Sequence, residues 1–299
     1  MGLVNSAAST QQPVNPETPI TKHNIVQPEM EDDIALNGYK LLQYYMPEEI
    51  LIQILSFVPT KDLLKCSEVC VNWNKWIKSD IVWILKFKRE KKQKPKKVPW
   101  FVYYAALGLD FFDNNFIKNG NGQDIYENWK INKKFSNHWI IENPPVGCDP
   151  LPLDIDDFNG HQSCFVTSFE KCNKEQVIKI SNPMLKQILN DFKPHIYVSE
   201  WVCGRYDCGC TYSMTIKLVT DDGSVHKNEI VKYTIQQWSN PAWKKLETTV
   251  KNYPKNIAKI IFEHEGKDSL FWAGHYGSKM AGAVVKILFD TIQDQKQCS

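Results

Sequence analysis

The stretch Met46-Pro47-Glu48-Glu49-Ile50-Leu51-Ile52-Gln53-Ile54-Leu55, followed by Pro59, Asp62, Leu63, Val69, Cys70, Trp73, Asp80 and Trp83, decides the first part of the fold. Pro47 suits the first turn of a helix, because its missing N–H would be unpaired there anyway. Glu48 and Glu49 follow where the helix dipole favours negative charge. The apolar residues after them recur at helical spacing. This pattern predicts three short helices.

Three short helices form a small unit. A unit of roughly 40 residues cannot bury all of these apolar groups alone. A partner helix seated in its groove is one remedy. The alternative is a helical subdomain that packs on the rest of the chain.

In order and spacing, these residues resemble an F-box, the helical module that connects a substrate receptor to an SCF-type ubiquitin ligase. The resemblance implies a non-catalytic protein whose F-box binds a Skp-type adaptor and, through it, a cullin–RING scaffold. The residues that it assigns to adaptor binding are Pro47, Leu51, Ile54, Leu55, Leu63, Val69 and Trp73. The expected F-box spans residues 40–88.

Composition limits the remaining options. The 299 residues fit one or two domains, and 42% are hydrophobic, which allows an ample core. A net charge of +2 argues against a dedicated nucleic-acid binder. Nine cysteines, without a secretory signal or an apolar run long enough to span a membrane, favour free thiols in a reducing compartment. We therefore expect a cytoplasmic protein.

Residues 1–39 are rich in Gln, Pro, Thr, Asn and Ser and show no apolar period, which predicts a disordered tail. The tail opens with Met1-Gly2-Leu3-Val4-Asn5-Ser6, a pattern that fits N-myristoylation at Gly2. One acyl chain binds membranes only marginally. Membrane contact is expected only if Gly2 is modified.

Residues 89–113 are expected to connect two domains. The basic run Lys86–Lys97 has two interpretations, a nuclear or anionic-surface signal and a solvated helix end with a linker, and the second is favoured. The aromatic and apolar segment Val98–Phe112 then predicts a connecting helix that packs one domain against the other.

From residue 114 to 292 the sequence changes to short strands with polar turns. Tyr212, Met214, Ile216 and Leu218 alternate with polar residues, the period of a half-buried strand, and 221–224 reads as a hairpin turn. The other predicted strands are 164–169, 176–180, 196–202, 230–237, 245–250, 257–263 and 283–289, with a helical turn at 184–190. This series predicts an antiparallel β-sandwich. The fold class is therefore α+β multidomain.

The second part also resembles a known family. Asn128-Trp129, Thr167–Cys172, Glu200-Trp201, Gly204–Cys210, Phe262-Glu263-His264 and Lys267–Gly277 stand in the order of the F-box-associated (FBA) domain. With the F-box, the resemblance is to the sugar-recognising F-box receptors, which implies a jelly-roll-like sandwich. Several members bind the chitobiose core of high-mannose N-glycans on proteins expelled from the endoplasmic reticulum.

The family's glycan pocket falls on Phe169, Asp207, Phe271 and Trp272. The face of C–H groups on a sugar ring packs on an aromatic plane, which is the role expected of Trp272. Phe169 and Phe271 would enclose acetamide methyls, and Asp207 would accept hydrogen bonds. A turn-stabilising role or a salt bridge with Arg205 is an equal interpretation for Asp207 and is compatible with the first.

The pocket departs from strong glycan binders at three positions. Ala273 stands where such binders carry Lys, Phe271 replaces Tyr, and His275 stands where Trp is frequent. Losing one or two polar contacts costs roughly 1–3 kcal/mol, or about 5- to 150-fold in affinity. An F-box adaptor that binds an unglycosylated protein surface is therefore the alternative function.

The other groups of reactive residues give weaker evidence of function. Cys203, Cys208 and Cys210 near His195 lack the paired spacing of a structural zinc site, so no metal is expected. His264 and its flanking glutamates would point to opposite faces of a strand. No phosphate loop, nucleophile elbow or HExxH motif is present, so neither a cofactor nor catalysis is expected.

Overall fold

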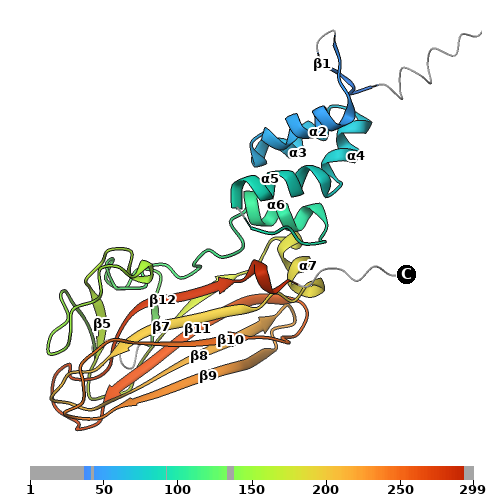
Figure 1. Cartoon of the computed structure of the whole chain (residues 1–299). Coiled ribbons are helices and arrows are strands. Elements are labelled where there is room, and N and C mark those ends of the chain that lie inside the picture. Colours follow the sequence, from blue (N-terminus) through green and yellow to red (C-terminus); the bar gives the residue numbers. More distant parts are fainter. Residues whose placement is uncertain (1–36, 42–43, 92, 133–137, 293–299) are drawn as a thin grey trace, which may run out of the picture.

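The computed structural model describes residues 37–41, 44–91, 93–132 and 138–292 (Figure 1). A helical domain stands at one end of a two-layered β-sandwich, and the chain passes from the first to the second through α6. Most of the tail predicted for residues 1–39, with Gly2, lies outside the described residues. No helix of the described part is both long and apolar enough to cross a membrane.

The helical domain begins with a short hairpin, β1 (Lys40–Leu41) and β2 (Tyr44–Tyr45). Its helices are α2 (Glu48–Phe57), α3 (Thr60–Cys66), α4 (Val71–Ile77), α5 (Ile81–Lys91) and α6 (Trp100–Gly108). Pro47 and Pro59 precede α2 and α3 as their N-caps, where a proline ring causes no loss of a helical hydrogen bond. The predicted short helices are confirmed.

The core of the helical domain forms where α2 packs against α5. Leu51, Leu55 and Leu63 are almost completely buried there, as is Trp83 from α5. The indole N–H of Trp83 donates to the carbonyl of Ile77 at 2.6 Å, so the ring is buried without an unsatisfied polar atom. The periodic leucines of the sequence are thus the internal packing residues of this domain.

The β-sandwich consists of two five-stranded antiparallel sheets, which confirms the predicted fold class. One sheet has the order β10-β7-β12-β5-β4 and the other β3-β6-β11-β8-β9. The bounds are β3 (Lys130–Ile131), β4 (Trp139–Glu142), β5 (Cys164–Thr167), β6 (Cys172–Lys179), β7 (Ile196–Cys203), β8 (Cys210–Thr220), β9 (Val225–Ile235), β10 (Lys244–Val250), β11 (Ile257–Asp268) and β12 (Lys279–Ile287). Helix α7 (Pro183–Asp191) lies between β6 and β7, the 3-10 turn η2 (Asp156–Phe158) lies between β4 and β5, and the 3-10 turn η3 (Phe289–Thr291) follows β12.

Alternation along the strands builds the sandwich core. Ile216 of β8 pairs with Phe262 of β11, and both side chains are fully buried. The hairpin predicted at 221–224 is present, since the Thr220 N–H donates to the Ser224 carbonyl at 3.1 Å. Strands β3 and β4 were not expected, because they are too short to show a period in the sequence.

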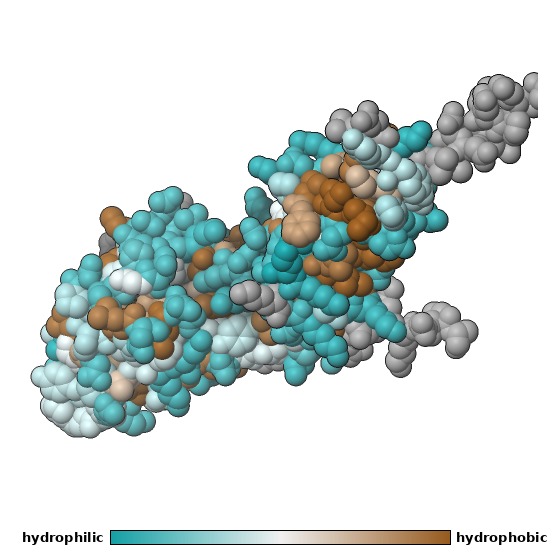
Figure 2. Space-filling view, turned by 45° about the horizontal axis from the view of Figure 1, so that its top comes forward, coloured by the Kyte–Doolittle hydropathy of each residue, from teal (hydrophilic) through white to brown (hydrophobic). Residues whose placement is uncertain are grey.

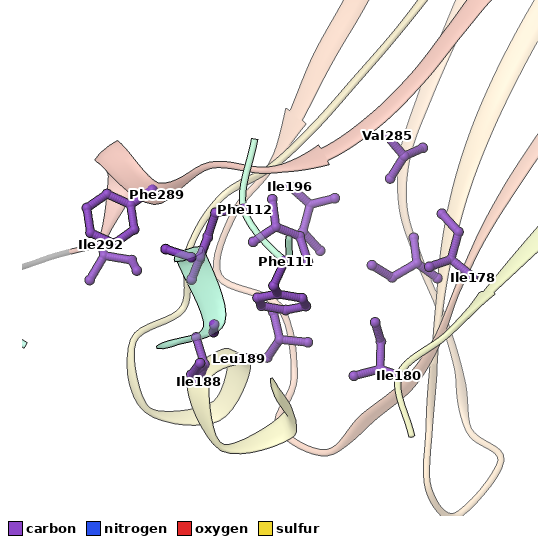
Figure 3. Close-up of a cluster of buried hydrophobic side chains, with 14 of the residues drawn as sticks. Phe111, Phe112, Ile178, Ile180, Ile188, Leu189, Ile196, Val285, Phe289 and Ile292 are labelled. Carbon is purple, nitrogen blue, oxygen red and sulfur yellow. The ribbon is translucent and has the colours of Figure 1, made fainter. Parts of the chain in front are cut away.

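An aromatic cluster joins the two domains, and Figure 3 shows three of its residues, Phe111, Phe112 and Phe289, among buried aliphatic side chains. Phe289 of η3 lies with its ring centroid 4.7 Å from Phe87 of α5 and 5.4 Å from Phe112. Phe101 of α6 contacts Phe192 at the end of α7, with centroids 6.3 Å apart. The C-terminal end of the sandwich is therefore packed directly on the helical domain.

One part of the basic run is not solvated. Lys86 is almost fully buried in α5, where its Nζ donates to the Val58 carbonyl at 2.8 Å and lies 2.7 Å from Glu90. The interpretation as a solvated helix end is wrong for this residue, because the carbonyl at the end of α2 and the Glu90 carboxylate compensate its charge.

Candidate functional site

The four residues predicted for glycan binding lie on loops at one end of the sandwich. Phe169 follows β5, Asp207 lies between β7 and β8, and Phe271 and Trp272 lie between β11 and β12. Strand pairing brings these loops together, because Cys210 at the start of β8 pairs with Asp268 at the end of β11. The four side chains therefore come from three loops that the sheets hold at the same end.

Phe169 and Phe271 form the apolar part of the site. Their ring centroids are 5.1 Å apart in an edge-to-face arrangement, which is a favourable aromatic geometry. Phe271 is 70% exposed and has a φ of 58°. A bulky residue in this left-handed region costs about 1–2 kcal/mol, so the surrounding loop must hold it there.

The carboxylate of Asp268 supplies that hold. Its Oδ1 accepts from the backbone N–H groups of Leu270 at 3.1 Å and Phe271 at 2.5 Å, and its Oδ2 accepts from Trp272 at 3.2 Å. Asp268 itself is 2% exposed. We did not predict this residue, although an Asp before a short loop is the usual sequence sign of such a turn.

Trp272 presents the largest ring of the site. It is 40% exposed, and its centroid lies 5.7 Å from that of Tyr276 in an edge-to-face contact. The guanidinium of Arg205 lies 4.8 Å from the other ring, that of Tyr276. Trp272 thus packs against Tyr276, which Arg205 contacts in turn, while part of the Trp272 ring stays exposed to solvent. Neither contact was predicted.

Asp207 is paired with Arg205. The Nε of Arg205 donates to Oδ1 at 2.9 Å and Nη2 donates to Oδ2 at 3.0 Å. These hydrogen bonds from the guanidinium lower the pKa of the Asp207 carboxyl below its ordinary value. The predicted salt bridge is therefore present, and the lone pairs that it leaves unused are the ones available to a ligand.

The three positions that depart from strong glycan binders offer few hydrogen-bond donors to a ligand. Ala273 is exposed beside Trp272 and has no polar group, and His275 is half-buried. Phe271 carries no hydroxyl. The polar atoms that a ligand would meet near the rings include those of Asp207 and Arg205.

The helical domain carries a second candidate surface. Figure 2 shows apolar groups gathered on the outside of this domain. Its exposed large apolar side chains are Tyr44, Tyr45, Ile50, Ile54, Phe57, Val69, Val71 and Ile81. A hollow lies beside them, lined by Ser67, Glu68, Cys70, Val71, Asn74 and Lys75.

The residues predicted to bind the adaptor divide into three groups by exposure. Pro47, Ile54 and Val69 are exposed, whereas Leu51, Leu55 and Leu63 are buried in the core of the helical domain. Trp73 is half-buried, and its indole N–H donates to the Gly38 carbonyl at 2.8 Å. Direct contact is available to the first group only, because the buried leucines already pack against other helices.

The cysteines predicted to be simple thiols are buried at the edge of the site. Cys203, Cys208 and Cys210 have almost no exposed surface, and burial is the largest cause that raises the pKa of Cys208 to about 11 and of Cys210 to about 12. Within the described ranges, no group of three His, Cys, Asp or Glu side chains could hold a metal ion.

His264 points into the sandwich, as the alternation predicts. Its Nδ1 lies 2.7 Å from a carboxylate oxygen of Glu200, which also accepts from the hydroxyl of Tyr212. Lys174 is buried in the same interior, with Nζ 3.8 Å from the centroid of the Trp129 ring. These groups are enclosed in the core and no ligand reaches them there.

Comparison with known proteins decides the family. A profile of the F-box domain matches residues 45–85, and a profile of the F-box associated region matches residues 109–287, more than half of the chain. The chain belongs to the F-box/FBA family. This F-box/FBA protein is accordingly a non-catalytic substrate receptor of SCF ubiquitin ligases, and its F-box implies binding to Skp1.

Curated relatives match over nearly the same length. F-box only protein 6 of Mus musculus is 30% identical over 256 residues, which cover 83% of this chain and 84% of the relative. F-box only protein 27 of Mus musculus is 27% identical over 294 residues, covering 90% and 97%. F-box only protein 2 of Bos taurus is 26% identical over 253 residues, covering 80% and 82%.

Among solved structures, the C-terminal family 22 carbohydrate-binding module of Clostridium thermocellum Xyn10B aligns with 60% of this chain and 95% of its own length. The TM-score is 0.36 and the sequence identity is 6%.

Proposed function

We propose that this F-box/FBA protein recruits misfolded glycoproteins to the SCF ligase by binding the chitobiose core of their high-mannose N-glycans. Such clients would be destined for degradation after export from the endoplasmic reticulum. The observation that supports the proposal is the meeting of Phe169, Phe271, Trp272 and Asp207 at one end of the sandwich. Two N-acetylglucosamine units would meet there the groups that suit them.

The aromatic groups fit the apolar parts of the disaccharide. The exposed face of Trp272 is a platform for the C–H face of a sugar ring, and the edge-to-face pair of Phe169 and Phe271 is a wall for an acetamide methyl. Because Asp268 fixes three successive backbone N–H groups of this loop, the rings are held before a ligand arrives. Preorganisation of this kind reduces the entropic cost of binding.

The polar groups fit the hydroxyl and amide groups of the sugar. Arg205 lowers the pKa of the Asp207 carboxyl, so the group stays ionised to a lower pH than an ordinary aspartate, and an ionised acceptor makes the stronger hydrogen bonds. The pair also keeps the carboxylate in one orientation. A sugar hydroxyl or acetamide N–H would donate to the oxygen lone pairs that Arg205 leaves unused.

For the adaptor, we propose that contact is made by Pro47, Ile54 and Val69 together with the neighbouring Ile50, Phe57 and Val71. These apolar side chains are exposed on the outer side of the helical domain. Leu51, Leu55 and Leu63 would shape this surface from below, and Trp73 would anchor α4 to the chain before β1. We place the protein in the cytoplasm, with membrane contact only through an acylated Gly2.

A protein client without sugar is the second candidate function. Ala273 and Phe271 favour it, because neither offers a polar group to a glycan where a donor would be useful. The two functions differ in one experiment, in which clients captured by the chain are compared before and after enzymatic removal of N-glycans. Loss of capture after deglycosylation is expected, and unchanged capture would favour the second function.

A further inference from the structure

Two exposed aromatic residues of this chain have the same unusual backbone. Among the residues that the structure describes, Phe271 and Trp238 are the aromatic ones with a positive φ, at 58° and 61°. They are also strongly exposed, at 70% and 72%. A bulky ring held both in a strained conformation and in water is unfavourable twice over, and such strain is found mainly where it serves a site.

Trp238 lies on the loop between β9 and β10, beside the predicted glycan loops. Its ring centroid is 6.2 Å from that of Tyr206, which is 48% exposed. The Trp238 N–H donates to the Tyr206 carbonyl at 2.7 Å, and the side chain of Gln237 donates to the Asp207 carbonyl at 3.0 Å. Trp238 is thus fixed to the loop that carries Asp207.

The loop that carries Asp207 also contacts the loop of Phe271 and Trp272. These two loops and the loop of Trp238 meet at Gly209, whose carbonyl accepts from the Ser269 N–H at 2.8 Å. A Cβ atom placed on Gly209 would lie 2.5 Å from the Ser269 hydroxyl and 3.1 Å from the Gln237 nitrogen. The approach of the loops therefore needs a glycine at this point, and it holds the loop of Trp238 against the loops of Asp207 and Trp272.

A continuous series of contacts connects these loops. It runs from Trp272 to Tyr276, from Tyr276 to Arg205, from Arg205 to Asp207, and through the adjacent Tyr206 to Trp238. A disaccharide would occupy only the part of this series from Trp272 to Asp207. The whole series fits a longer ligand that has a second apolar face beyond the Asp207 carboxylate.

We propose that Tyr206 and Trp238 form a second sugar subsite, which binds a mannose unit beyond the chitobiose core of the same oligosaccharide. This inference rests on the proposed function. The neighbours of Trp238 in the sequence are polar, Gln236, Gln237, Ser239 and Asn240. Two exposed rings flanked in the sequence by amide and hydroxyl side chains suit the C–H face and the hydroxyls of a hexose. A client polypeptide would need a broader apolar patch.

The test compares two ligands, free chitobiose and a free high-mannose oligosaccharide that contains it, by titration of the 299-residue chain. Trp238→Gly removes the ring and suits the left-handed backbone, so its fold is preserved. Trp238→Phe keeps an aromatic ring and serves as the matched control. We expect the unmodified chain and Trp238→Phe to bind the longer sugar about 3- to 10-fold more tightly than chitobiose, the range of one aromatic contact.

In Trp238→Gly, that gain is expected to disappear while the Kd for chitobiose is unchanged. The inference is overturned if the gain survives in Trp238→Gly, or if the unmodified chain shows no gain. A parallel titration uses a high-mannose glycopeptide, and the inference is also overturned if Trp238→Gly weakens binding of this glycopeptide alone, because the subsite would then contact polypeptide. Chitobiose binding by the unmodified chain decides the proposed function separately, so the two failures are distinguishable.

Discussion

Arg205 donates two parallel hydrogen bonds to the carboxylate of Asp207, and this pair lies within the series of contacts that joins the aromatic rings of the site. The two residues are separated by a single position in the sequence, so the ion pair between them stabilises the loop that carries both. The arrangement keeps an ionised acceptor at the surface without letting it rotate. A bidentate pair of this kind is among the stronger hydrogen-bonded contacts in proteins.

The pair predicts how binding depends on pH. Because Arg205 lowers the pKa of Asp207 in the folded chain, the carboxylate stays ionised and able to accept hydrogen bonds from a sugar until the pH falls through this lowered value. In Arg205→Gln, the acid limb of chitobiose binding should move to higher pH. Calorimetric titrations from neutral to acid pH measure this, and identical limbs in both proteins would contradict the pairing.

Asp268 predicts a loss of order in one loop. Asp268→Ala removes the acceptor of three backbone N–H groups and should lower the free energy of unfolding by about 1–3 kcal/mol. Chitobiose affinity should fall as well, since Phe271 and Trp272 would no longer be held. Denaturant unfolding and sugar titration of the same protein measure both effects. Full affinity in Asp268→Ala would show that the loop is ordered by other contacts.

Substitutions at exposed and at buried residues of the helical domain should have different effects, one on adaptor binding and the other on folding. Ile54→Asp should abolish capture of a Skp-type adaptor while the chain stays folded, because Ile54 is 42% exposed. Leu55→Asp should instead unfold the helical domain, since a carboxylate would be buried at a position that is 2% exposed. Pull-down and circular dichroism separate the two outcomes.

The matched control for Ile54→Asp is Val225→Asp. Val225 is an exposed apolar residue at the start of β9 in the sandwich. It should leave adaptor capture unchanged. Normal capture by a folded Ile54→Asp protein would exclude the proposed adaptor surface.

The interior of the sandwich predicts a stabilising substitution. Lys174 is fully buried, and burial lowers its pKa well below the ordinary value, so the lysine favours the unfolded state wherever it is protonated there. Lys174→Met should raise the free energy of unfolding at pH 7, because the variant has no ammonium group to desolvate. The gain should shrink toward pH 10.4, where the unfolded lysine also loses its proton. Denaturant unfolding at both pH values tests this, and a less stable variant would show that the contacts of Nζ with the surrounding rings outweigh burial.

The elements with strong periods were predictable from the sequence. The alternation around Met214 predicted β8, and the helical spacing around Leu55 predicted α2. Strand limits were less accurate, because β11 continues to Asp268, five residues beyond the predicted end at Glu263. The extension carries few apolar residues, and its pairing with β6 and β8 comes from neighbouring strands and not from its own pattern.

The candidate site was predictable only in part. The family pattern pointed to Phe169 and Trp272, because it attaches a role to a position. The contacts of Gly209 and of Tyr276 with Arg205 join loops that are far apart in sequence, so a single sequence contains no sign of them. Asp268 bonds instead to residues two to four positions further on, and its place before a short loop was a sequence sign that we did not use. The burial of Leu51 and Leu63 inside the helical domain was not predictable either. A helical pattern shows which residues share a face, but it does not show whether that face packs internally or binds a partner.

The most direct test of the central claim is titration of the 299-residue chain with chitobiose, beside Trp272→Ala and a Val225→Ala control at the opposite end of the sandwich. We predict binding with a Kd in the millimolar range or tighter, retained in Val225→Ala and lost in Trp272→Ala. Absence of binding to the unmodified chain, or equal binding by Trp272→Ala, would contradict glycan recognition at these loops.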